Sequence, residues 1–276
     1  MVFIGENILD TPGGLCHPQS GSNFEHFCSI VAPRRWQEVF LLMLTVCFDA
    51  GGKDDTAHKV ITVAGFASFS GVWAEFERRW SDRLRVDHLP YFHAGEFAHS
   101  TGAFKDGWKG NKERRDRLSS DLMNVIRDCG LRKFGSIVSL VDFRDWRKDR
   151  PFNRAQAFAF AAIDPVEAFH SYAWREGIKN NVRYVFEKGD SEDQLRWIFR
   201  HRGYIEPDFA WSKPHVDRKG FAYDPFLGLQ AAGWIAYEFY LDADRVLRGE
   251  PTERWPLRQF QSLPGTVTVR RLKELA

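Results

Sequence analysis

The sequence predicts an α/β fold in which a mixed central sheet is flanked by helices. Short apolar runs rich in β-branched and aromatic residues alternate with segments whose apolar residues recur at helical spacing. Strands and helices interleaved in this way pack as a sheet covered by helices. The chain has 276 residues, 43% of them hydrophobic and 28% charged, which is enough for one large domain with a sizeable core.

The first part of the chain differs in character from the rest. Gly, Pro, Ser and His are scattered over residues 1–37 without any period. We therefore expect residues 1–42 to form a poorly structured N-terminal appendage. Residues 43–250 would form the domain, and residues 251–276 a C-terminal extension that packs on it.

The first two strands are expected to form a hairpin. An apolar run over residues 39–49 ends in Asp49, and the turn residues Ala50–Asp55 separate it from a second strand over residues 58–66. A helix should follow, capped by Ser70. Its apolar stripe consists of Trp73, Phe76, Trp80 and Leu84.

The later elements follow from the same signals. We expect further strands at 134–141 and 182–187. Helices are expected at 111–128, at 153–175 with a kink or a break near Asp164 caused by Pro165, and from Lys188–Ser191 to Gly203. Residues 204–223 are expected to be a polar loop. Asp224 is expected to be the N-cap, and Pro225 the first residue, of a long helix that ends at Gly249.

Charge and cysteine usage limit the classes of partner and compartment. The net charge is only +2, but residues 109–154 carry 13 Lys and Arg against 7 Asp and Glu. This segment is either a solvated surface or a nucleic-acid-binding patch formed by Arg144, Arg147 and Lys148. The four cysteines lack zinc-site or disulfide-framework spacing, no apolar run approaches the about 20 residues of a membrane helix, and no signal peptide is evident, so a cytoplasmic protein is expected.

Two carboxylates lie at the carboxyl ends of strands, where the active and binding sites of α/β sheets are usually found. Asp49 follows Thr-Val-Cys-Phe, and Glu187 follows Arg-Tyr-Val-Phe. A single carboxylate in such a place is often only a turn or helix cap. If the two strands are neighbours, however, the pair has the oxygen ligands that Mg²⁺ prefers.

The order of several short motifs resembles the domain-of-unknown-function 3800 family, which is placed in the ribonuclease H-like superfamily. The motifs are CFDAGG, VAGFASFSGVWAEFERRW, YFHAGEF, GAFKDGW, YVFEKGD and PFLGLQAAGWIAYE, and the resemblance covers roughly residues 44–245. It implies a ribonuclease H-like fold in which Asp49 and Glu187 bind Mg²⁺ or Mn²⁺. It also implies that His93 and Glu96 lie near the same cleft, and Glu96 would be a further metal ligand if its loop folds over the site.

The late helix departs from the family pattern at one position. Gly233 stands where the pattern Leu-Gln-x-Ala-Asp-x-x-Ala has an acidic residue. Glu238 cannot substitute for it, because five residues at about 100° each place it about 140° around the helix. Loss of one carboxylate from a metal centre weakens its affinity or geometry.

Two hypotheses about function follow. The first is a metal-dependent nuclease that cleaves phosphodiester bonds in DNA or RNA, with Asp49 and Glu187 as catalytic residues and Lys213 as a contact to the nucleic acid backbone. The second is a catalytically degenerate ribonuclease H-like module that binds nucleic acid, a protein partner or a second copy of itself. Trp108, Trp146 and Trp211 lie in polar contexts and are candidates for stacking on bases.

Overall fold

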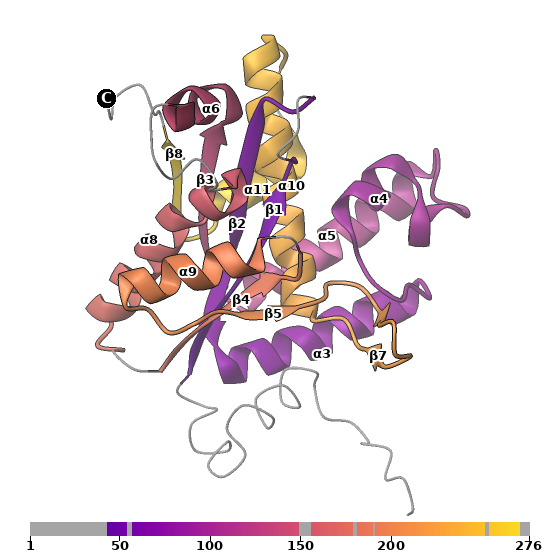
Figure 1. The fold of residues 1–276 in the computed structure, drawn as a ribbon. Coiled ribbons are helices and arrows are strands. Elements are labelled where there is room, and N and C mark those ends of the chain that lie inside the picture. Colours follow the sequence, from indigo (N-terminus) through magenta and orange to yellow (C-terminus); the bar gives the residue numbers. More distant parts are fainter. Residues whose placement is uncertain are drawn as a thin grey trace, which may run out of the picture.

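A computed structural model describes residues 43–53, 57–148, 156–178, 181–189, 191–251 and 254–270. The expected appendage, residues 1–42, lies outside these ranges. The described part is an α/β structure built on a mixed six-stranded sheet, as the sequence predicts (Figure 1). The strands of this sheet are β1 (Leu44–Gly51), β2 (Val60–Phe69), β3 (Arg132–Ser139), β4 (Val182–Glu187), β5 (Asp208–Ala210) and β8 (Gly265–Arg270).

The order across the sheet is β5-β4-β1-β2-β3-β8. The first three strands form an antiparallel meander, so the expected β1–β2 hairpin is confirmed. On the other side of β1, the strands β4 and β5 run parallel to it. The strand β8 runs parallel to β3 at the far edge.

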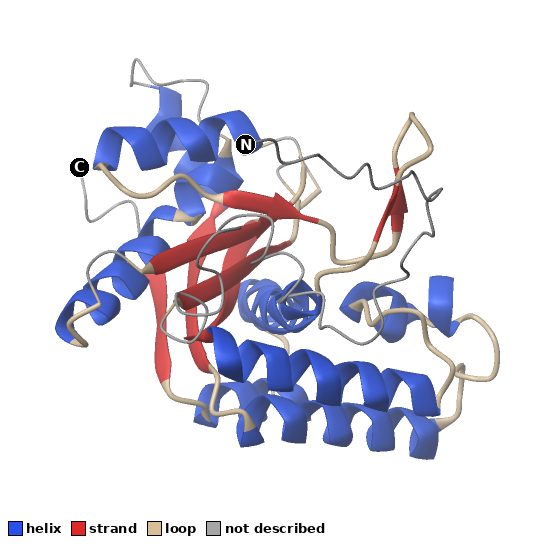
Figure 2. Cartoon of the chain, turned by 90° about the horizontal axis from the view of Figure 1, so that it is seen from below, coloured by secondary structure: helices blue, strands red, loops and turns tan. Residues whose placement is uncertain are grey.

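Helices cover both faces of the sheet, and Figure 2 shows one long helix end-on beside the strands. This central helix is α10, which packs on β1 and β2. One face carries α3 (Ser70–Val86), α4 (Ala94–His99), the 3₁₀ turn η1 (Gly102–Phe104), α5 (Lys112–Asp128), α10 (Leu227–Arg248) and α11 (Trp255–Ser262). The opposite face carries α6 (Leu140–Lys148), α7 (Ala157–Ala161), α8 (Ile163–Arg175) and α9 (Glu192–Arg202). Within the described residues, no helix is both long and apolar enough to cross a membrane.

Strand alternation decides which way each side chain of β1 points. Val46 and Phe48 pack in the core beneath α7–α9, whereas Cys47 packs in the core beneath α10. Asp49 is two residues beyond Cys47 and therefore lies on the α10 face. By the same alternation Glu187 lies on that face, because Val185 packs in the α10 core.

Two of the expected helix caps are wrong. The helix α3 begins at Ser70 itself, with Phe69 at the N-cap position, because the Ser70 hydroxyl donates to the carbonyl of Met43 instead. The helix α10 has Phe226 at its N-cap position, not Asp224. The expected apolar stripe of α3 is confirmed, since Trp73, Phe76, Trp80 and Leu84 are all buried.

The segment expected to be a polar loop contains three short strands. β5 joins the sheet beside β4, and β6 (His215–Val216) pairs with β7 (Ala222–Tyr223) in a separate small hairpin. The strands are too short to give a readable alternation of apolar and polar residues. The expected interruption near Asp164 is confirmed as a break, because α7 ends at Ala161 and α8 begins at Ile163.

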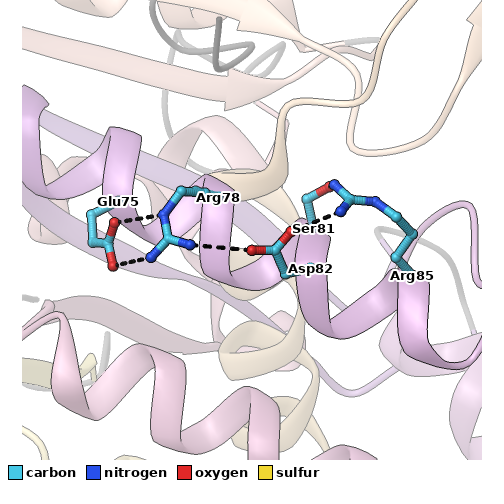
Figure 3. Close-up of polar contacts among 5 residues, drawn as sticks. All are labelled: Glu75, Arg78, Ser81, Asp82 and Arg85. Carbon is cyan, nitrogen blue, oxygen red and sulfur yellow. Dashed lines mark hydrogen bonds and ion pairs between the residues drawn. The ribbon is translucent and has the colours of Figure 1, made fainter. Parts of the chain in front are cut away.

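The exposed face of α3 carries a series of ion pairs that neutralise one another (Figure 3). Arg78 contacts Glu75 at 2.7 Å and Asp82 at 3.2 Å, and Arg85 contacts the same Asp82 at 2.8 Å. These are helical neighbours three or four residues apart. The arginines of this face therefore do not present uncompensated positive charge.

Candidate functional site

The parallel pairing of β1 and β4 brings the two strand-end carboxylates together. Phe48 is the register partner of Phe186, so Asp49 and Glu187 follow side by side on strands about 4.8 Å apart. Both side chains lie on the α10 face of the sheet. The convergence expected for neighbouring strands is thus present.

Asp49 is held between its own strand and α10. Its Oδ1 accepts a hydrogen bond of 2.7 Å from the backbone N–H of Ala50. Its Oδ2 faces Gly233, where a β-carbon would be only 2.6 Å away. Burial raises the pKa of Asp49 to about 6, although the Ala50 hydrogen bond and the charge of Lys213 act in the opposite direction.

Glu187 has one satisfied and one unsatisfied oxygen. Oε1 accepts a hydrogen bond of 3.2 Å from the N–H of Ser212. Oε2 is buried and has no hydrogen-bond partner among the described residues. Burial, and then the nearby charge of Asp49, raise the pKa of Glu187 to about 8. A buried oxygen without a donor favours either a proton or a cation beside it.

Lys213 links the Asp49–Glu187 pair to a third carboxylate, that of Glu96. Its Nζ is 2.6 Å from Oε1 of Glu96, and its charge lowers the pKa of both Asp49 and Glu187. The hydroxyl of Tyr91 donates to Glu96 at 2.8 Å. Burial alone would raise the pKa of Glu96, but hydrogen bonds from Lys213 and Tyr91 outweigh it and lower the pKa.

His93 completes the same polar cluster. Its Nδ1 accepts a hydrogen bond of 3.3 Å from the N–H of Glu96, so it caps α4. Burial and the charge of Lys213 lower the pKa of His93, which favours its neutral form. His93 and Glu96 therefore lie close to Lys213, and through it close to the two strand-end carboxylates.

The strand ends open into a cavity of about 460 Å³. Asp49 and Glu187 line it together with Lys53, Gln156, Lys188 and Glu192. The cavity lies at the carboxyl ends of β1 and β4, where ligands bind in open α/β sheets. The two carboxylates can therefore meet a molecule that enters from this end.

The small residues after Asp49 serve the packing of α10. A β-carbon at Gly51 would be 2.3 Å from the carbonyl oxygen of Ala236. The Thr62 hydroxyl donates to that same oxygen at 2.8 Å. Gly52 has a φ of +85°, which glycine adopts without strain and which forms the hairpin turn. Glycine at these positions thus lets the helix approach Asp49 closely.

The donor set fits a hard divalent cation, but with few protein ligands. Two adjacent carboxylates provide oxygen ligands, and Oε2 of Glu187 has no other partner in the described structure. Among the described residues, no three His, Cys, Asp or Glu side chains are arranged to hold a metal ion. Glu96 is engaged by Lys213 and Tyr91 in the present arrangement. Gly233 faces Asp49 and supplies no side-chain ligand.

Comparison with known proteins adds no relative. No family model, curated protein or solved structure matches this chain. The site must therefore be interpreted from its own geometry.

The other expected nucleic-acid contacts lie away from the carboxylates. Arg144, Arg147 and Lys148 lie on α6, which begins where β3 ends, two strands away from β1. Lys148 pairs with Asp145 at 2.8 Å, and Arg147 lies over the ring of Phe143. None of these three residues lines the cavity that contains Asp49.

Two residues with positioning roles have no clear signal in the sequence. Ser212 supplies the N–H that orients Glu187. The Gln230 amide donates to the carbonyl of Ser212 at 2.8 Å and accepts from the Trp80 indole and the Phe92 N–H, both at 2.9 Å. Gln230 thereby fixes the loop that carries Ser212 and Lys213 to α10. The motif that contains Gln230 contributed to the family resemblance but gave no indication of this positioning role.

Proposed function

We propose that this protein is a ribonuclease H-like hydrolase that cleaves phosphodiester bonds in nucleic acid with a divalent cation, Mg²⁺ or Mn²⁺, held by Asp49 and Glu187. One observation carries the proposal: two half-buried carboxylates lie side by side at adjacent strand ends, and the buried Oε2 of Glu187 has no hydrogen-bond donor among the described residues. Both carboxylates line a cavity at the end of the sheet that is associated with ligand binding.

The strand arrangement of the sheet supports the ribonuclease H-like part of the proposal. The family resemblance implies a mixed central sheet flanked by helices, and the described residues form such a sheet, with an antiparallel meander extended beside its first strand by parallel strands. The two carboxylates end the first strand of the meander and the first of the parallel strands. These are the places that the family resemblance assigns to metal-binding residues.

The electrostatics of the pair favour cation binding. Burial raises the pKa of Asp49 to about 6, and burial together with the charge of Asp49 raises the pKa of Glu187 to about 8. At neutral pH Asp49 is therefore mostly ionised and Glu187 retains a proton that a cation would displace. A bound cation would stabilise the charge that develops on the attacking and leaving oxygens of a phosphodiester. The N–H groups of Ala50 and Ser212 fix the directions of the two carboxylates, and Lys213 adds positive charge beside them.

A second candidate function rests on Gly233. This position faces Asp49 directly but supplies no carboxylate, and the described residues hold no group of three suitable ligands. Such a centre would bind a cation weakly or leave it poorly placed. The alternative is therefore a ribonuclease H-like module that binds nucleic acid or a protein partner without cleaving.

A paired measurement of metal binding and cleavage distinguishes the two. Labelled single- and double-stranded DNA and RNA would be incubated with Mn²⁺ or with chelator, using the wild type, Asp49→Asn, Glu187→Gln and the exposed control Glu75→Gln. Mn²⁺ binding would be followed by titration calorimetry on the same proteins. The nuclease proposal predicts Mn²⁺-dependent cleavage that both site variants lose and the control retains. Cleavage that persists in both site variants, or no cleavage by the wild type, would contradict it.

A further inference from the structure

The small β6–β7 hairpin is a structured element that stands apart from the central sheet (Figure 2). Its two strands pair His215 with Tyr223 and Val216 with Ala222. Asp217 holds the turn between them, because its Oδ1 accepts hydrogen bonds of 2.9 Å from the N–H groups of Lys219 and Phe221. Hydrogen bonds within the hairpin therefore fix the conformation of its tip.

The tip presents both aromatic surface and positive charge. Phe221 is 63% exposed and Tyr223 46% exposed. Arg218 and Lys219 stand between these rings and β6, and both are exposed. Neither forms an ion pair with any residue of the described chain, in contrast to Arg78 and the other arginines of α3.

The base of the hairpin continues this surface toward the candidate site. The ring of Trp211 stacks on that of His215 with centroids 3.9 Å apart. Lys188, which follows Glu187 directly, places its Nζ 5.6 Å from the centre of the Trp211 ring. The next residues after Trp211 are Ser212, which donates to Glu187, and Lys213, whose charge acts on both carboxylates.

The other two candidate stacking residues are already used in packing. Trp108 is buried, with Arg114 over its ring. Trp146 packs against Phe160 at a centroid distance of 4.9 Å. Of the three tryptophans singled out in the sequence, Trp211 is the one that continues into a cationic, exposed aromatic surface.

We infer that the hairpin segment 211–223 is an arm that binds single-stranded nucleic acid and leads it to the Asp49–Glu187 site. This inference rests on the proposed function and names the substrate class. Cationic side chains attract the phosphate backbone. Exposed rings stack on bases, and unpaired bases offer their faces for stacking in a way that the bases of a duplex do not. Phe221 and Tyr223 therefore favour a single strand over a duplex.

The test measures binding without cleavage. Fluorescence anisotropy of labelled single-stranded DNA, single-stranded RNA and duplex DNA would be recorded in chelator with the full chain. The variants are Phe221→Ala and the double variant Arg218→Ala/Lys219→Ala. The matched control is Arg147→Ala/Lys148→Ala on α6, which removes the same two residue types and lies on the opposite side of the molecule in Figure 1.

Distinct results are expected from the two hairpin variants. Phe221→Ala should weaken single-strand binding about tenfold with little change in its salt dependence, since it removes stacking. The double variant should weaken binding and lower the slope of log K against log salt by about 1.4, the value for two lost phosphate contacts on a single strand. The α6 control should bind as the wild type does, and duplex should bind more weakly than single strand.

Several results would overturn the inference. These are wild-type affinity in both hairpin variants, stronger binding of duplex than of single strand, loss of binding in the α6 control alone, or no binding by the wild type. Asp49→Asn serves to separate the inference from the proposed function. If Asp49→Asn and the wild type both bind the single strand in chelator but the wild type does not cleave it with Mn²⁺, the proposed function fails and the arm stands. If the wild type cleaves and the hairpin variants bind normally, the arm fails and the function stands.

Discussion

Gly233 lies directly against Asp49, so that a β-carbon at position 233 would be 2.6 Å from Oδ2 of the aspartate. The contact joins the middle of α10 to the end of β1. A side chain at position 233 would therefore be directed at the first strand-end carboxylate. Because the atom in the way is the end of a short side chain, Asp49 can rotate to accommodate a side chain there.

Replacing Gly233 by Asp should destabilise the protein in chelator and increase its response to Mn²⁺. A third carboxylate in this half-buried site adds like-charge repulsion, which we expect to cost about 1–3 kcal/mol of unfolding free energy at pH 8. A bound cation would relieve the repulsion, so the rise in melting temperature with Mn²⁺ should exceed that of the wild type. Gly233→Asn is the matched control without charge. Equal Mn²⁺ responses in the Asp and Asn variants would argue against a metal site here.

The Asp49–Glu187 pair should make stability fall as pH rises. Burial raises the pKa of Asp49 from 3.8 to about 6 and that of Glu187 from 4.5 to about 8, so between these limits the folded state holds more protons than the unfolded state. The stabilisation is complete below about pH 4 and is lost as pH rises through the raised pKa values. A tenfold change in a proton-binding constant corresponds to about 1.4 kcal/mol, so the two increases in pKa together correspond to a loss of at most about 8 kcal/mol.

Denaturant unfolding in chelator from pH 5 to pH 9 measures this effect. Glu187→Gln should be more stable than the wild type at pH 9 and lose that advantage at pH 5. Asp49→Asn should show the same trend over a lower pH range. Parallel pH profiles for the wild type and Glu187→Gln would show that this carboxylate titrates normally.

Gly51 should be intolerant of even a single methyl group. Its β-carbon would lie 2.3 Å from the backbone oxygen of Ala236, which cannot move without shifting α10. We expect Gly51→Ala to lower the unfolding free energy by about 3 kcal/mol or more, as strong overpacking does. Gly189→Ala is the matched control, because a β-carbon there meets nothing within 4 Å. Similar melting temperatures for the two variants would contradict the close helix approach.

Asp87 should be important for stability and sensitive to acid. It bridges Arg83 at 2.8 Å on α3 and Arg114 at 2.9 Å on α5, with only 6% of its side chain exposed. Burial alone would raise the pKa of Asp87, but hydrogen bonds from the two arginines outweigh it and lower the pKa. Its contribution is therefore present above the unfolded pKa of about 3.9 and is lost as pH falls toward the lowered folded value.

The expected cost of Asp87→Asn is about 3 kcal/mol at neutral pH, because it breaks a buried ion pair. Asp82→Asn tests the role of burial, since Asp82 also bridges two arginines, Arg78 and Arg85, but on the exposed face of α3 (Figure 3). That variant should unfold like the wild type. The comparison is made by urea denaturation at pH 7 and at about pH 2.5, below the unfolded pKa, where the difference between Asp87→Asn and the wild type should narrow. An Asp82 variant as unstable as the Asp87 variant would contradict the assignment.

The sequence predicts most of the long elements and the carboxylate pair. Periodicity identifies α3 from Trp73, Phe76, Trp80 and Leu84, and apolar runs that end in Asp49 and Glu187 mark two strand ends. These signals are strong because each depends on many residues that face one core. That β4 pairs with β1, however, is a long-range pairing to which the local pattern contributes nothing.

The rest of the site depends on contacts distant in the chain. Ser70 and Asp224 have typical cap residue types, yet the Ser70 hydroxyl bonds the Met43 carbonyl instead. β5 has only three residues, so its pairing with β4 could not be read from alternation. The placement of Lys213 beside both carboxylates requires the Gln230 side chain to hold the loop to α10. Whether the pair binds a cation stays a prediction.

The separation of Asp49, Glu187 and α10 along the chain also governs when the site can exist during synthesis. The β1–β2 hairpin is local and can form early, but Asp49 has no neighbouring carboxylate until β4 has left the ribosome and paired with β1. The turn of α10 that contains Gly233 and packs against Asp49 is synthesised later still. A nascent chain therefore carries no finished centre, and any chemistry at these carboxylates begins only after most of the protein has been made.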